Sequence, residues 1–146
     1  MAIEVKKNLK IDTQNNKFVG IDLPFSKSDG VDGYFKSTSL TVEAVKNNIR
    51  MLINTNKGER LMQPTLGLSL ERFLFEQIND QTETIIKDDI QQAFLYWLPF
   101  VTINDLKIIR NDNNNENQLK INIEFFINNN RNTLDSIDVL IGTLGI

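Results

Sequence analysis

The sequence contains neither cysteine nor histidine among its 146 residues. Their absence excludes disulfide bonds, thiolate chemistry and catalytic groups in which histidine activates a serine or a cysteine. It also removes the ligands that most transition-metal sites use. The remaining possibilities are chemistry by carboxylate, lysine, tyrosine or a serine–lysine pair, or no chemistry at all.

Long apolar runs and clusters of positive charge are missing as well. No stretch approaches the roughly 18 apolar residues that a membrane-spanning helix needs, and residues 1–10 lack the hydrophobic centre of a signal peptide. The net charge is −3 and the pI is near 5.0, whereas nucleic-acid-binding proteins usually present a basic face. We therefore expect a cytoplasmic product that binds neither nucleic acid nor membrane.

The length suits one domain with a single modest core. The first part of the chain alternates short apolar pieces with glycine and aspartate, which are typical of turns. We expect residues 1–38 to form an extended arm that drapes over the domain or over a neighbour. Residues 39–146 are expected to form a single α+β domain.

Helical periodicity dominates the middle of the chain. Apolar residues at three- and four-residue spacing predict a helix that begins near Thr41 and ends by residues 56–58, where Gly58 can adopt a left-handed cap. A short helix is predicted over residues 69–77. The sequence Asp80-Gln81-Thr82-Glu83 fits a capping box, and it predicts a second long helix over residues 80–96.

The last third of the chain changes period. A strand is predicted over residues 102–110, and from residue 118 onward apolar and polar residues alternate as in a half-buried strand. Polar turns are predicted over residues 111–117 and 128–132, and residues 137–141 form a third strand or a short apolar tail. The predicted fold is α+β, with two or three helices packed on a small antiparallel sheet.

A dense pattern of turn, charged and aromatic residues follows the first predicted helix. It comprises Gly58-Glu59-Arg60, then Pro64, Gly67 and Phe73-Leu74-Phe75-Glu76. An arginine held on a rigid loop can offer a planar fork to a carboxylate or to several backbone carbonyls. From composition alone, a solvated charge pair on a turn is the favoured explanation of Glu59 and Arg60.

This combined pattern resembles the baseplate wedge and sheath-initiator family of contractile phage tails, which is related to the small baseplate component of type VI secretion systems. The upstream segment Gly33-Tyr34-Phe35-Lys36-Ser37-Thr38 is similar to the arm of large myophage members, and the resemblance covers about residues 34–109. It implies a structural subunit without enzymatic activity, cofactor or small-molecule substrate. Its implied partners are other baseplate wedge proteins and the tail sheath protein, in the tail baseplate of the virion.

The chain departs from the family pattern at the end of the second long helix. Many members carry Glu-Pro-Arg there and use its charges to grip a neighbouring wedge subunit, whereas this chain has Leu98-Pro99-Phe100 after Trp97. Trp97 and Phe100 could form an apolar anchor instead, although both rings could also belong to the core. The candidate partner-binding residues are Gly58, Glu59, Arg60, Pro64, Gly67, Trp97, Pro99 and Phe100.

The C-terminal region also allows two interpretations. In the family it resembles the handshake domain of the sheath subunit, which exchanges strands with incoming sheath protein. A strand edge with unpaired N–H and C=O groups is a template for strand addition, so the resemblance predicts that residues 128–146 start the sheath. Strands that merely complete the sheet would give the same pattern.

Two other functions remain open at this point. A peptidoglycan hydrolase of the tail tip would need two carboxylates across a cleft, for which Glu59, Glu71, Glu76 and Asp80 are candidates. A chain with 19 acidic residues offers such pairs by chance. The third possibility is a small adaptor unrelated to tails, which would use the arm or the strands to bind a host protein.

Overall fold

The computed structural model of the chain describes residues 18–28, 33–76, 79–111, 118–128 and 130–142. The chain divides into two compact units, Met1–Ile49 and Arg50–Ile146, and the division falls inside helix α1 (Thr41–Asn54). None of the helices in the described ranges is both long enough and apolar enough to span a bilayer.

The N-terminal unit contains a small antiparallel hairpin. Strand β1 (Gly20–Ile21) pairs with β2 (Ser37–Thr38), and the side chain of Asn47 on α1 donates hydrogen bonds to β1 and to the residue that follows it, both at 3.4 Å. The predicted arm therefore contains two short strands that pair with each other. They pair through backbone hydrogen bonds and are too short to show an alternation of apolar and polar residues in the sequence. Residues 1–17 lie outside the described residues, and the predicted division into an arm over 1–38 and one domain stays a prediction.

Helix α1 begins at Thr41, as predicted, and ends at Asn54. The prediction that Gly58 caps this helix is wrong, because Gly58, with a φ of +90°, lies four residues farther along in a turn of the next loop. The short helix predicted over residues 69–77 is present as a 3₁₀ helix, η2 (Leu70–Phe75). Its tighter winding is typical of short helical connectors.

Helix α2 (Asp80–Trp97) has its N-cap one residue before the predicted position. The Asn79 side chain accepts hydrogen bonds from the backbone N–H of Thr82 at 2.8 Å and from its hydroxyl at 2.9 Å. The predicted cap at Asp80 is wrong. Asparagine and aspartate cap helices about equally well, so residue type cannot distinguish between these two neighbours.

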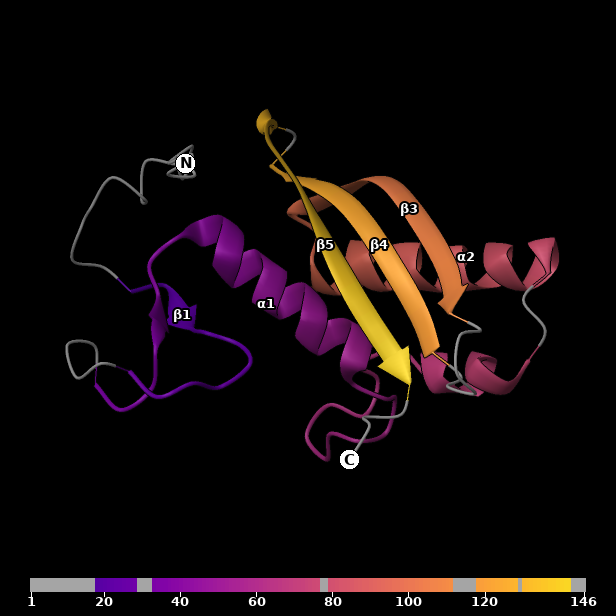
Figure 1. The fold of residues 1–146 in the computed structure, drawn as a ribbon, viewed down its shortest axis with the longest axis horizontal. Helices are drawn as coiled ribbons and strands as arrows, with labels where there is room; N and C mark the ends of the chain where they lie inside the picture. The colour runs from indigo at the N-terminus through magenta and orange to yellow at the C-terminus, as the bar shows by residue number, and fades with distance from the viewer. Residues whose placement is uncertain (1–17, 29–32, 77–78, 112–117, 129, 143–146) are drawn as a thin grey trace. The chain divides into compact units, whose positions relative to one another are not determined.

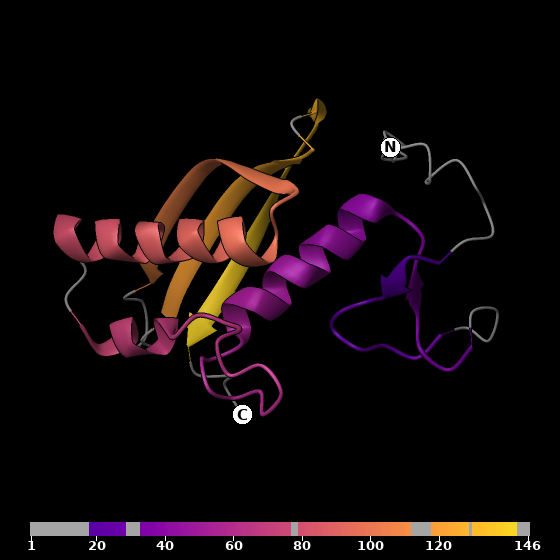
Figure 2. The same ribbon diagram turned by 180° about the vertical axis from the view of Figure 1, so that it is seen from behind.

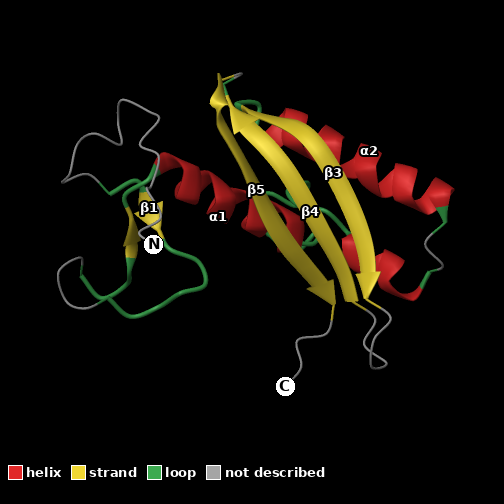
Figure 3. Cartoon of the chain, turned by 45° about the horizontal axis from the view of Figure 1, so that its top comes forward, coloured by secondary structure: helices red, strands yellow, loops and turns green. Residues whose placement is uncertain are grey.

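The C-terminal unit contains a three-stranded antiparallel sheet in the order β3 (Val101–Asn111), β4 (Gln118–Ile127) and β5 (Asn130–Gly142) (Figures 1 and 3). Strand β4 is central, so β3 and β5 form the two edges. Strand β5 is longer than the predicted residues 137–141 because the polar residues Asn130, Asp135 and Ser136 also pair with β4. The predicted turn over residues 128–132 is correspondingly shorter.

One face of this sheet carries the core of the C-terminal unit. Helix α2 lies against that face (Figure 2). The alternation along β4 places every second residue in the interior, as the sequence predicted. The buried side chains of β4 and α2 are Leu119, Ile121, Ile123, Phe125, Ile127, Ile86, Ile90 and Phe94. The predicted α+β class, with helices on a small antiparallel sheet, is confirmed.

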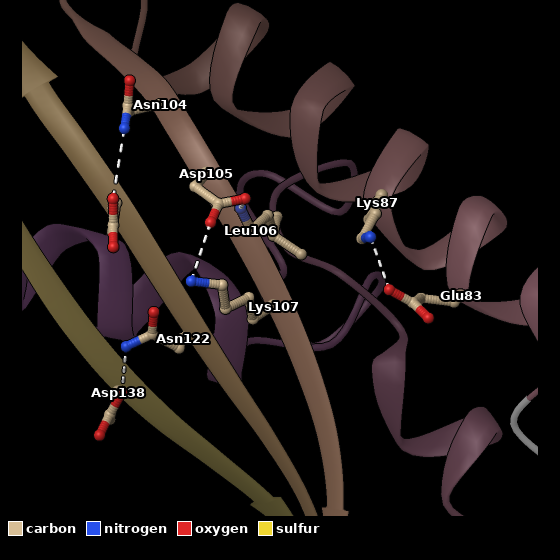
Figure 4. Close-up of polar contacts among 9 residues, drawn as sticks. Glu83, Lys87, Asn104, Asp105, Leu106, Lys107, Asn122 and Asp138 are labelled. Atoms are coloured by element: carbon tan, nitrogen blue, oxygen red, sulfur yellow. Dashed lines mark hydrogen bonds and ion pairs between the residues drawn. The ribbon is translucent and has the colours of Figure 1, made fainter.

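The opposite face of the sheet carries a network of polar contacts (Figure 4). Asn122 donates to Asp138 at 2.6 Å, and Lys120 forms an ion pair with the same carboxylate at 2.8 Å. The Asn122 hydrogen bond, followed by that of Lys120, holds the pKa of Asp138 below its ordinary value. The Lys107 ammonium similarly lowers the pKa of Asp105. All these groups are exposed or partly exposed, so the contacts organise a solvated surface and add little stability.

Candidate docking site

The loop of residues 55–68, between α1 and η2, is closed at its base by a close approach of two backbone segments. The N–H of Leu68 donates to the carbonyl oxygen of Thr55 at 2.8 Å. Gly67 is buried with a φ of +110°, and a Cβ added to it would lie 2.1 Å from the Thr55 carbonyl oxygen. Only glycine allows both this dihedral angle and this distance, so the glycine in the sequence pattern is a structural requirement.

The middle of the 55–68 loop is held by further bonds of its own. The N–H of Gly58 donates across the loop to the carbonyl oxygen of Pro64 at 2.8 Å. Glu59 is tied to Asn56 twice, because its N–H donates to the Asn56 carbonyl at 3.1 Å and its carboxylate accepts from the Asn56 N–H at 3.0 Å. The Gly-Glu part of Gly-Glu-Arg therefore shapes the loop.

The tip of the 55–68 loop is a turn of four residues, from Arg60 to Gln63. It is closed by a hydrogen bond from the Gln63 N–H to the Arg60 carbonyl at 3.2 Å. Its two central residues, Leu61 and Met62, are 96% and 94% exposed. Arg60 is also exposed. This tip therefore presents a cation and two apolar side chains to solvent.

The base of the loop and the second half of α2 line one pocket of about 260 Å³. Gly67 and Trp97, two of the predicted partner-binding residues, both belong to its lining. Trp97 is half-buried and meets the edge of Tyr96 with ring centroids 4.8 Å apart at 86°. The carboxylate in the lining, Asp89, is held by Arg72 at 2.7 Å. The pocket therefore combines an aromatic wall with a rim of fixed charge.

The sequence of this region decides the family of the chain. The profile of a family described as baseplate wedge protein gp25 matches residues 40–132, which contain the loop, the pocket and most of the sheet. The chain belongs to the gp25 baseplate wedge family. The resemblance drawn from the Gly-Glu-Arg pattern is confirmed.

Solved structures with the same fold include two baseplate assemblies. A chain of the anti-feeding prophage baseplate, six-fold symmetrised, is 26% identical with a TM-score of 0.61, and the match covers 76% of this chain and 86% of that chain. A chain of the type VI secretion baseplate complex is 14% identical with a TM-score of 0.56, over 69% of this chain and 92% of that one.

A third structure, from Geobacter sulfurreducens, is described as a candidate tail lysozyme. It is 24% identical with a TM-score of 0.59, and the match covers 70% of this chain and 90% of that chain. At this level of identity, it and the type VI secretion chain show a shared fold alone. A comparison with curated protein sequences gave no match.

Not all predicted docking residues of this gp25-family chain come together. Pro99 and Phe100 follow the end of α2 and do not line the pocket. Phe100 is 38% exposed, and its carbonyl oxygen accepts a hydrogen bond from the N–H of Asn128 at 2.8 Å. Trp97 and Phe100 thus both keep exposed surface, and neither is a fully buried core residue.

Several exposed apolar residues are absent from the predicted set of partner-binding residues. Leu61 and Met62 form the loop tip, Phe75 is 81% exposed at the end of η2, and Tyr96 is exposed beside Trp97. A signal for the tip was present, because the centre of a tight turn usually carries glycine, asparagine, aspartate or proline. Leucine and methionine at both central positions are unusual and indicate a surface role.

None of the candidate hydrolase residues Glu59, Glu71, Glu76 and Asp80 lines the pocket of this gp25-family chain. The pocket lining contains one carboxylate, Asp89, whereas glycoside hydrolysis needs two across the substrate. Glu59 lies in the loop, where its carboxylate accepts the Asn56 N–H. Among the described residues, no group of three acidic side chains is placed to hold a metal ion.

Proposed function

We propose that this chain is a non-enzymatic structural subunit of a contractile-tail baseplate wedge, which docks on other wedge proteins and starts the sheath. The gp25 family match over residues 40–132 supports the baseplate role, and the anti-feeding prophage baseplate chain supports it through the shared fold at 26% identity. The observation that carries the docking proposal is that Gly67 of the 55–68 loop and Trp97 of α2 line the same pocket.

The proposed docking surface works by burying protein surface in a fixed geometry. The 55–68 loop is held by its own hydrogen bonds, so little conformational entropy is lost when a partner binds. Trp97 and Tyr96 present aromatic surface beside it. Aromatic rings at the centre of an interface commonly contribute most of its binding energy. These two rings could therefore replace the charged Glu-Pro-Arg anchor that many family members have and this chain lacks.

The proposed sheath-binding element is β5, an edge strand of the three-stranded sheet. This strand pairs with β4 in an unbroken register from Gly142 to Asp135, and the other edge strand, β3, does so from Asn111 to Asp105. Each edge strand has one irregularity, between Asp135 and Asn130 in β5 and between Ile103 and Asp105 in β3. The choice of β5 therefore rests on the resemblance of residues 128–146 to the strands that the sheath subunit exchanges, because an edge strand of either kind can accept a further strand.

Hydrogen exchange tests the strand addition without altering the chain. In an edge strand every second N–H points away from the sheet, so alternate amides of β5 are expected to exchange quickly in the free protein. When purified sheath protein is added, the same amides are expected to slow by about tenfold or more, since each gains a backbone partner. Residue-resolved exchange by NMR measures this change.

The alternate amides of β3 serve as the internal control for this experiment. Their exchange is expected to stay unchanged, because the proposal places strand addition at β5 alone. Equal protection of β3 and β5, or protection of neither while sheath protein binds elsewhere, would contradict the strand-addition proposal. Clearing of peptidoglycan by the purified protein in a zymogram would contradict the non-enzymatic role.

Replacement of Trp97 by alanine tests the pocket as a docking surface. Trp97 is half-buried, so its loss is expected to cost about 1–2 kcal/mol of unfolding free energy, less than the roughly 3–5 kcal/mol of a fully buried aromatic residue. The variant should remain folded at room temperature and fail to co-purify with the neighbouring wedge proteins. Chemical denaturation and size-exclusion chromatography of the co-expressed complex measure the two effects.

Leu95→Ala is the matched control for Trp97→Ala. Leu95 precedes the pair Tyr96–Trp97 on α2, is exposed and does not line the pocket. It is expected to change neither stability nor co-purification. If the Trp97→Ala variant is unfolded, the ring of Trp97 acts as a core residue. If the variant is folded and assembles with the wedge proteins as the wild type does, the pocket is not a docking surface.

A further inference from the structure

The turn Arg60–Gln63 places two apolar side chains in solvent, where they contribute no buried surface to the stability of the fold. Of the large apolar side chains in the described part of the chain, Leu61 and Met62 are the most exposed. Single exposed apolar residues are common on protein surfaces, but two neighbours at the centre of one tight turn form a compact protrusion. Burying both in a partner would recover most of their transfer free energy.

The protrusion stands on a rigid support. Three backbone hydrogen bonds hold the loop at successive levels. The bond from Gln63 to Arg60 closes the turn at the tip, the bond from Gly58 to Pro64 crosses the middle of the loop, and the bond from Leu68 to Thr55 closes its base. The shape of the tip is therefore fixed before binding, which lowers the entropy cost of docking. Met62 adds adaptability, since its unbranched thioether side chain fills irregular spaces.

Charge beside the tip indicates the chemistry of the partner. Arg60 is part of the turn and is exposed, whereas the next cation toward the N-terminus, Lys57, lines the Trp97 pocket at the base of the loop. The nearby carboxylate of Glu59 accepts the Asn56 N–H within the loop. The tip thus combines an apolar centre with one cation, Arg60, and its complement is an apolar pocket with a carboxylate at its rim.

We propose that Leu61 and Met62 form a plug that inserts into an apolar, acid-rimmed pocket of a neighbouring wedge protein. This inference rests on the proposed function and specifies its contact: the plug supplies affinity, while Arg60 supplies orientation and the rate of association. It concerns the tip of the loop, which is separate from the Trp97 pocket at the loop base.

The test is co-expression of the full chain with the baseplate proteins encoded beside it, followed by affinity measurement on the purified complex. The double variant Leu61→Ser, Met62→Ser is expected to weaken binding by about 30-fold or more, the equivalent of the roughly 2 kcal/mol that marks an interface hot spot. The loss should appear as faster dissociation. Its melting temperature should equal that of the wild type, because both side chains are exposed in the free chain.

Two further variants separate the plug from general surface effects. Arg60→Gln is expected to slow association and to reduce the dependence of binding on salt, with little change in dissociation. Ile85→Ser removes an apolar side chain that is half exposed on the first half of α2, and it is expected to bind as the wild type does.

The outcomes distinguish this inference from the function on which it rests. If the wild type forms the complex and the serine double variant binds equally well, the plug is overturned while the wedge function stands. If the wild type forms no complex with any neighbouring baseplate protein, both are overturned. If the wild-type chain self-associates and the double variant is monomeric, the tip binds a second copy of this chain. That result would contradict the proposal that its partner is a different wedge protein.

Discussion

Replacement of Gly67 by alanine is expected to lower the free energy of unfolding by about 3 kcal/mol or more. A residue with a Cβ at a positive φ costs about 1–2 kcal/mol, and forcing an atom into occupied space costs about 1–3 kcal/mol more. The added Cβ would lie 2.1 Å from the carbonyl oxygen of Thr55. Because that neighbour is backbone, the two segments must separate and the Leu68–Thr55 hydrogen bond would be lost. Chemical denaturation measures the change.

Gly58→Ala is the matched control for Gly67→Ala. Gly58 has a similar positive φ of +90°, but an added Cβ would meet no atom within 4 Å. Its replacement should show the dihedral cost alone, about 1–2 kcal/mol. Equal losses for both variants would mean that the close approach at Gly67 does not stabilise the loop. A larger loss for Gly58→Ala would contradict the structure of the loop.

Replacement of Phe125 by alanine is expected to cost about 3–5 kcal/mol, the range for a buried aromatic residue that leaves a cavity. Phe125 lies on the central strand, is fully buried, and pairs with Ile103 on one side and Asp135 on the other. The cavity would open where both edge strands meet β4. For a small domain, a loss of this size approaches the whole free energy of folding, so calorimetry should show a strongly lowered melting temperature or no folded state.

Phe126→Ala provides the comparison on the same strand. Phe126 is the next residue along β4, pairs with Thr102 and is only partly buried on the opposite face. Its replacement is expected to cost about 1–1.5 kcal/mol, since less apolar surface leaves the water when it packs. If Phe126→Ala were the more damaging variant, the register of β4 would be shifted by one residue, which would exchange the two faces.

The sequence was most informative where one periodic pattern spans a whole element. Helix α2 and strand β4 were predicted because their buried residues recur with the period of a helix and of a strand. The first half of β5 gave no such signal, since polar residues there pair through the backbone with β4. The hairpin of β1 and β2 was missed for the same reason.

Within the candidate docking site, the sequence could not predict which of the candidate residues lie together. Gly67 and Trp97 were both selected, and both line the pocket. Leu61 and Met62 were passed over because an apolar residue in a loop can be buried or exposed, and tertiary contacts alone decide between the two. The N-cap shift from Asp80 to Asn79 shows a similar limit, since both residue types have the same chemistry at a helix start.

The network of polar side chains on the open face of the sheet has a consequence for how this protein can associate. Sheets stack into layers when flat faces of interlocking, uncharged side chains meet without water. Here Asn122 and Lys120 on β4 both bind Asp138 on β5, and stacking a second layer would strip water from these charges. Fibril-like layering on this face is therefore disfavoured, whereas the proposed addition of a strand at β5 lies in the plane of the sheet and would leave these charges in water.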